Sequence, residues 1–146
     1  MTRLSHMDES RRTVLVIDDD DMVLDLAGMY LNQLGYGVLT ATGGLIGLGD
    51  AVKFRPDCIL LDLAMPVVDG FTVLAKRGRI AEIARIPIIV LSANRNSEDV
   101  KRAVAMGAAG YIAKPIDINI LANRLERIVP SPYFTRPKSS EIRWKR

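Results

Sequence analysis

The residue best suited to covalent chemistry is Asp62, which follows the apolar run 58–61 and opens the segment 62–70. Three other short apolar runs also end in polar side chains, which are Asp18 and Asp19, Ser92, and Lys114. The carboxyl ends of parallel strands meet at one edge of a sheet, so we expect these groups to converge there. A carboxylate beside a hydroxyl and an ammonium has the surroundings needed to accept a phosphoryl group.

Three of these groups, Asp18, Asp19 and Asp62, are carboxylates and repel one another when they are close together. A cation can neutralise them, and an oxygen-only site without histidine or cysteine favours Mg²⁺ over zinc or copper. The competing interpretation is that residues 18–21 only cap the first helix. We assign that role to Asp20 and Asp21, and metal binding to Asp18 and Asp19, which directly follow a strand.

Taken singly, Lys114 is best read as a solvated surface charge, and Ser92 as a turn or cap hydroxyl. Taken together with the aspartates, they supply a cation and a hydroxyl donor for one transferring phosphoryl group. The combination therefore outweighs the separate readings.

Apolar runs alternate with amphipathic stretches along the chain, which predicts βαβ units and a parallel sheet. The expected strands are residues 13–17, 37–40, 58–61, 88–91 and 110–113. The last helix has the clearest period, with Asp117 as its N-cap and Pro130 as its stop.

The second helix contains several glycines between residues 43 and 49, and each interior glycine costs about 1 kcal/mol relative to alanine. We therefore expect this helix to be weak or locally distorted. The order of the glycines matches neither of the common phosphate-binding loops, so a phosphate loop is not favoured.

The chain has 146 residues, of which 49% are hydrophobic, and this is enough for one globular domain. Its apolar runs are too short to span a membrane or to form a secretory signal, and we expect a cytoplasmic location. The formal charge of +3 resides mainly in the end of the chain, so nucleic-acid binding by the folded part is not favoured. Cys58, the single cysteine, is expected to be a buried apolar residue.

The ordered motifs resemble the response-regulator receiver domain of bacterial two-component systems. The motifs that carry the resemblance are residues 14–19, residues 62–66 with Asp69 and Gly70, residues 87–93 and residues 107–115. The resemblance implies an α/β flavodoxin-like (βα)5 doubly wound parallel sheet with strand order 2-1-3-4-5. It divides the chain into a flexible N-terminal extension (1–11), the receiver domain (12–130) and a basic tail or truncated linker (131–146).

The resemblance also implies the roles of individual residues. Asp62 would take a phosphoryl group from a histidine kinase or phosphotransfer protein, with Mg²⁺ held by Asp19 and Asp62, by Asp18 through water, and by the backbone carbonyl of Ala64. Ser92 and Lys114 would hold the phosphoryl oxygens. Ser92 and Tyr111 would then act as the switch that reshapes the face of the fourth helix, fifth strand and fifth helix.

The implied function is a signalling switch in a phosphorelay and not an enzyme. Its partners would be the kinase, a downstream protein or a missing output domain, and a second copy bound through the switch face. Ala64 and Asn94 occupy positions that tune the lifetime of the phosphate in this family. Because alanine cannot orient a water molecule, we expect an aspartyl phosphate that is not unusually short-lived.

Three competing functions are weighed against this one. A haloacid-dehalogenase-type phosphatase needs a second aspartate two residues after the first, and Ala64 stands there. A flavin carrier needs hydroxyls and glycines after the first strand, where residues 18–21 would repel a phosphate. A receiver-like module that is never phosphorylated is disfavoured by the complete set of site residues.

Overall fold

The computed structural model describes residues 11–93 and 97–132. Strands and helices alternate along the chain, as the pattern predicted. The elements are β1 (Thr13–Ile17), α1 (Asp21–Gln33), β2 (Gly37–Ala41), α2 (Gly44–Phe54), β3 (Cys58–Asp62), α3 (Gly70–Gly78), β4 (Ile88–Ser92), α4 (Ser97–Ala105), β5 (Gly110–Ala113) and α5 (Ile118–Ile128). Three strands extend one residue beyond the predicted end, so Asp62 and Ser92 are the last residues of β3 and β4.

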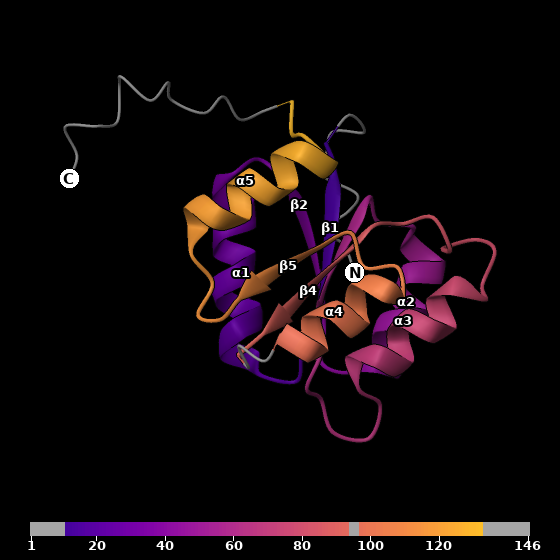
Figure 1. The fold of residues 1–146 in the computed structure, drawn as a ribbon. Coiled ribbons are helices and arrows are strands. Elements are labelled where there is room, and N and C mark those ends of the chain that lie inside the picture. Colours follow the sequence, from indigo (N-terminus) through magenta and orange to yellow (C-terminus); the bar gives the residue numbers. More distant parts are fainter. Residues whose placement is uncertain (1–10, 94–96, 133–146) are drawn as a thin grey trace.

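All the strand pairings are parallel, and the order is β2-β1-β3-β4-β5. Helices α1 and α5 cover one face of this sheet, and α2, α3 and α4 cover the other (Figure 1). This is the flavodoxin-like α/β fold with the expected strand order. The central strands β3 and β4 are buried at every position, which explains their unbroken apolar sequences.

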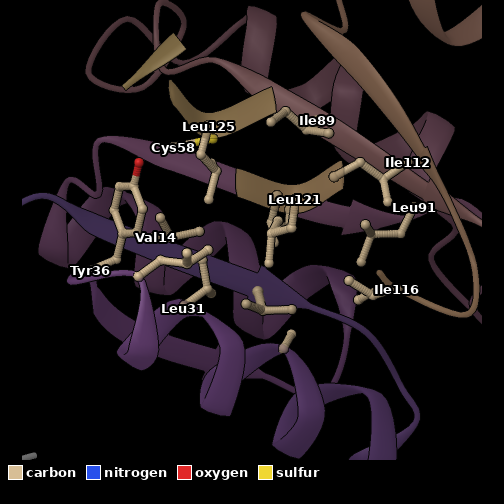
Figure 2. Packing of buried hydrophobic residues seen from close by; sticks show 14 of the residues in the cluster. Val14, Leu31, Tyr36, Cys58, Ile89, Leu91, Ile112, Ile116, Leu121 and Leu125 are labelled. Carbon is tan, nitrogen blue, oxygen red and sulfur yellow. The ribbon is translucent and has the colours of Figure 1, made fainter. Parts of the chain in front are cut away.

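Each face of the sheet has its own hydrophobic core. On the α1–α5 side, the Tyr36 hydroxyl donates a hydrogen bond to the Val129 carbonyl at 2.7 Å. Cys58 lies in the same cluster close to Leu125 (Figure 2), and burial raises the pKa of its thiol to about 12. A thiol with so high a pKa is unreactive at neutral pH, in agreement with the buried role expected for it.

Aspartates cap the helices at the predicted places. The side chain of Asp20 accepts a hydrogen bond from the Met22 amide, and that of Asp117 accepts from the amides of Asn119 and Ile120. The predicted capping role of Asp20 is thereby confirmed. Asp21 lies in the first turn of α1, where its negative charge interacts favourably with the positive end of the helix dipole.

The glycine-rich second helix differs from the expectation of a distorted element, because α2 runs without interruption from Gly44 to Phe54. Packing explains part of its composition. A Cβ atom on Gly47 would lie 2.4 Å from Ile17 Cδ1, and one on Gly44 would lie 2.8 Å from Val68 Cγ1. These glycines let the helix approach β1 and the segment after β3 closely, whereas Gly49 faces open space.

These surroundings predict opposite effects for two alanine substitutions in one helix. Gly49→Ala should raise the free energy of unfolding by about 0.5–1 kcal/mol, because alanine loses less backbone entropy and meets no neighbour. Gly47→Ala should lower it by about 1–3 kcal/mol, because the buried Ile17 must shift. Urea denaturation of the two variants measures the difference, and equal effects would contradict the packing explanation.

Candidate functional site

The polar residues singled out from the sequence lie together at the carboxyl ends of the strands. Asp18 and Asp19 follow β1, Asp62 ends β3, Ser92 ends β4 and Lys114 follows β5. Backbone hydrogen bonds fix these strand ends, since the Lys114 amide donates to the Ser92 carbonyl at 2.9 Å and the Asp18 amide to the Ala41 carbonyl at 3.1 Å. The order of the strands thus brings distant parts of the chain into one pocket.

Asp18, Asp19 and Asp62 each offer an oxygen, and these oxygens all lie within 4.8 Å of one another. Asp18 is fully buried and Asp62 is 3% exposed, whereas Asp19 faces the solvent. This donor set contains only carboxylate oxygens, which is the chemistry that a hard divalent cation prefers. The cluster is therefore consistent with a metal site.

Lys114 supplies the positive charge of the pocket. Its Nζ lies 2.8 Å from Asp18 Oδ2 and 3.2 Å from Asp62 Oδ1. Burial alone would lower the pKa of this amine, but the hydrogen bond to Asp18 and the charges of both aspartates outweigh burial and raise it. The lysine is therefore held as a cation between the two buried carboxylates.

The pKa of Asp62 is raised, first by burial and then by repulsion from Asp18. The nearby Lys114 and the Ala64 amide, which donates to Asp62 Oδ1 at 3.4 Å, offset part of this effect. The carboxylate of Asp62 thus carries an electrostatic cost in the metal-free protein, and a cation would relieve that cost.

The segment after β3 holds Asp62 in place through Asp69 and Gly70. The Asp69 side chain caps α3 by accepting from the Thr72 amide at 2.9 Å, and the Gly70 amide donates to the Leu63 carbonyl at 3.0 Å. A Cβ atom on Gly70 would lie 2.5 Å from the carbonyl oxygen of Asp62. The sequence motif contained both residues, but its pattern gave no reason to assign them this supporting role.

Val67 lies in the same segment with a φ of 65°, fully exposed to solvent. The left-handed region is unfavourable for a β-branched residue, so the backbone is strained there. The strain lies in the connection between Asp62 and its supporting helix.

The remaining predicted residues differ in how exposed they are to solvent. Ser92 is buried at 5% exposure, and Ala64 is exposed two residues beyond Asp62. Tyr111 lies opposite Val90 in the sheet and is half-buried against the core beneath α2, α3 and α4. Asn94 lies outside the described residues.

The charge arrangement predicts how the stability of the metal-free protein depends on pH. A carboxyl group with a raised pKa binds its proton more tightly in the folded state, so stability falls as the pH rises from about 3.8 through the folded-state pKa. Asp62→Asn should remove this component and raise the free energy of unfolding at pH 7, because no buried carboxylate then has to stay charged beside Asp18. Chemical denaturation in a chelator-containing buffer measures both effects.

Glu82→Gln, at an exposed position before β4, is the matched control and should leave that component of the pH profile unchanged. A less stable Asp62→Asn variant at pH 7 would contradict the electrostatic account.

Comparisons with known proteins agree with this geometry. Residues 14–126 match the family described as the response regulator receiver domain. The chain is 37% identical over 116 residues to the DNA-binding dual master transcriptional regulator RpaA of Synechocystis sp., covering 80% of this chain and 48% of that protein. It is also 37% identical over 116 residues to the transcriptional regulatory protein KdpE of Mycobacterium tuberculosis, covering 80% of this chain and 50% of that protein. The chain thus spans about half the length of these relatives.

Comparison with solved structures also finds proteins of similar fold. The chemotaxis protein CheY4 of Vibrio cholerae is 30% identical, with a TM-score of 0.77 over 82% of this chain and 99% of that one. The receiver domain of sensor histidine kinase PA1611 from Pseudomonas aeruginosa, with magnesium in its active site cleft, is 29% identical, with a TM-score of 0.75 over 81% and 97% of the two chains. This chain belongs to the response regulator receiver domain family, and its acidic pocket is typical of the phosphoacceptor switches of two-component signalling.

Proposed function

We propose that Asp62 is the phosphoacceptor of a two-component phosphorelay. The observation that carries this proposal is the position of its carboxylate, which is buried and lies 3.2 Å from the Lys114 amine that it shares with Asp18. An Asp62 oxygen would attack the phosphorus atom of a phosphohistidine on a kinase or phosphotransfer protein. The new P–O bond replaces the P–N bond, and the histidine leaves with the bonding electron pair.

The proposed metal is Mg²⁺, held directly by Asp19 and Asp62, through water by Asp18, and by the backbone carbonyl of Ala64. The all-oxygen donor set supports this assignment, as does the magnesium in the PA1611 receiver domain. Bound Mg²⁺ would neutralise negative charge on the carboxylates and on the incoming phosphoryl group. The protein groups around Asp62, and not the metal alone, hold its phosphate-accepting oxygen in position.

Lys114 is proposed to hold a phosphoryl oxygen once Asp62 is modified. Its amine already lies 3.2 Å from Asp62 Oδ1, so little movement would be needed. The hydroxyl of Ser92, at the end of the neighbouring strand, would hold a second oxygen. Both contacts join a charged phosphoryl group to a donor and are therefore strong hydrogen bonds.

The proposed readout is a population shift at the face of α4, β5 and α5, with Ser92 and Tyr111 as the switch. Helix α4 suits such a change because Ala103 is the one fully buried side chain among residues 98–105. The Arg102 guanidinium covers the Phe71 ring at 4.0 Å, which links α4 to α3. Tyr111 packs against the same hydrophobic core as Ala103 of this helix, which connects the two parts of the proposed switch.

The family implies a histidine kinase as partner, and the curated relatives named above are transcription regulators. We propose that the modified face binds a downstream protein or an output domain, or a second copy of the phosphorylated chain. No helix in the described part of the chain is both long and apolar enough to cross a membrane. The cytoplasmic location stays a prediction, as do the N-terminal extension and the basic tail, whose residues 1–10 and 133–146 lie outside the described residues.

Phosphorylation is tested with acetyl phosphate and Mg²⁺. Intact-mass spectrometry should show the addition of one phosphoryl group to the native chain and none to Asp62→Asn, because the amide cannot form the acyl phosphate. Beryllofluoride with Mg²⁺ should stabilise the native chain thermally, since it binds only the intact pocket. The exposed-residue variant Glu82→Gln should behave like the native chain.

Modification that persists in Asp62→Asn would contradict the assignment of the acceptor. A native chain that takes up neither reagent would instead favour a receiver-like module that is never phosphorylated.

The lifetime of the aspartyl phosphate forms a separate prediction. The side chain of Ala64 has no polar atom with which to orient water, so hydrolysis should not reach the fast extreme of the family. Ala64→Asn should shorten the lifetime, and Ala105→Asn on the exposed surface of α4 should not. The decay of phosphorylated protein after removal of the donor gives the three rates, and a native rate faster than that of Ala64→Asn would refute the explanation.

A further inference from the structure

The outer edge of β2 is the open edge of the sheet on the side away from β5. Strand β2 pairs with β1 alone, and no other described strand lies beyond it. The Gly37 amide donates to the Arg12 carbonyl, and the Ala41 carbonyl accepts from the Asp18 amide. Successive residues of a strand direct their hydrogen-bonding groups to opposite sides, so Val38 and Thr40 direct their amides and carbonyls outward.

Nothing in the sequence of β2 protects this edge. Strands exposed at sheet edges usually carry a charge, a proline or a bulge that prevents pairing with other chains. The segment Gly-Val-Leu-Thr-Ala contains none of these, and its pairing with β1 keeps an unbroken register. The edge is therefore competent to accept another strand.

A hollow of about 900 Å³ surrounds this edge and lies between α1 and α2. Its α1 wall includes Asp25, Gly28 and Met29, and its α2 wall includes Asp50 and Lys53. Met29 is 57% exposed, although it is a large apolar residue. A Cβ atom on Gly28 would meet nothing closer than 3.8 Å, so packing within one copy does not require glycine there.

More apolar surface extends from both walls. Met22 lies on the same face of α1 as Asp25 and Met29, and Ile46 lies on the same face of α2 as Asp50 and Lys53, by helical spacing. Met22 is 79% exposed and Ile46 is 57% exposed. Exposed apolar residues beside an unpaired strand indicate a surface that is covered by another molecule.

We propose that a second copy of this chain covers the surface, by antiparallel pairing of the two β2 strands about a two-fold axis through Leu39. In that register, Val38 of each copy lies opposite Thr40 of the other. Opposed residues of an antiparallel pair exchange both of their N–H···O bonds, so every outward group of the two residues is satisfied. The set of groups is thus complementary to itself, as a two-fold interface requires.

The flanking helices favour the same occupant. The two-fold axis sets α1 against α1 and α2 against α2 in opposite directions, and the bare backbone at Gly28 permits a close approach. On α2, Asp50 and Lys53 are about one turn apart, so the reversed second copy places acid opposite base. The interface forms without a phosphoryl group. It lies at the β2 edge of the sheet, whereas the α4–β5–α5 face lies at the β5 edge.

The test is sedimentation equilibrium of the full chain over a range of concentrations, without phosphoryl donor and with a chelator. A reversible dimer is expected. Thr40→Lys and Met29→Glu should each weaken it by at least tenfold, because they bring charge into the interface, while thermal unfolding shows that both variants fold. Val104→Glu on the exposed side of α4 is the matched control and should dimerise like the native chain.

Amide hydrogen exchange locates the contact. The amides of Val38 and Thr40 should exchange more slowly as the protein concentration rises, whereas that of Leu39, which faces β1, should not change. A chain that stays monomeric up to about 1 mM overturns the proposal. So does a dimer weakened by Val104→Glu alone, or protection of Val38 and Thr40 that is independent of concentration.

Discussion

The structure depends on one electrostatic constraint, which is that two buried carboxylates, Asp18 and Asp62, share a single ammonium group. Neither acid is accessible enough for water to screen its charge, so the amine of Lys114 must lie close to both. Strand order satisfies this requirement, because β1, β3, β4 and β5 are successive neighbours and end at the same edge. The apolar strands are thus the means by which charges from distant parts of the chain are held together.

The arrangement that suits the pocket for chemistry at Asp62 therefore also lowers the stability of the folded protein. Burial and the charge of Asp18 raise the pKa of Asp62 and make the metal-free protein less stable, and a bound cation would offset the repulsion between the two carboxylates. The two hydrophobic cores offset this loss of stability, since both faces of the sheet are packed with buried aliphatic side chains. Helix α4 contributes little to those cores, because Ala103 is its one fully buried side chain among residues 98–105.

Much of this arrangement could be predicted from the sequence. Uninterrupted runs of Val, Ile and Leu located the buried strands, and Asp20 and Asp117 marked the starts of two helices. The continuity of α2 could not be predicted, because Gly47 is explained by its contact with Ile17, which is distant in the chain. The edge position of β2 could be predicted only through the strand order that the family resemblance implies, since the sequence of a strand does not show which of its sides is paired.

Gly70 shows how closely the backbone of the pocket is fitted. The first turn of α3 rests so near the carbonyl of Asp62 that even one methyl group would push the two apart. The position of the Asp62 carboxylate at the end of β3 therefore depends on Gly70 having no side chain. Any larger residue at this position would displace both α3 and the Asp62 carboxylate. A single substitution there would therefore impair folding and signalling at once.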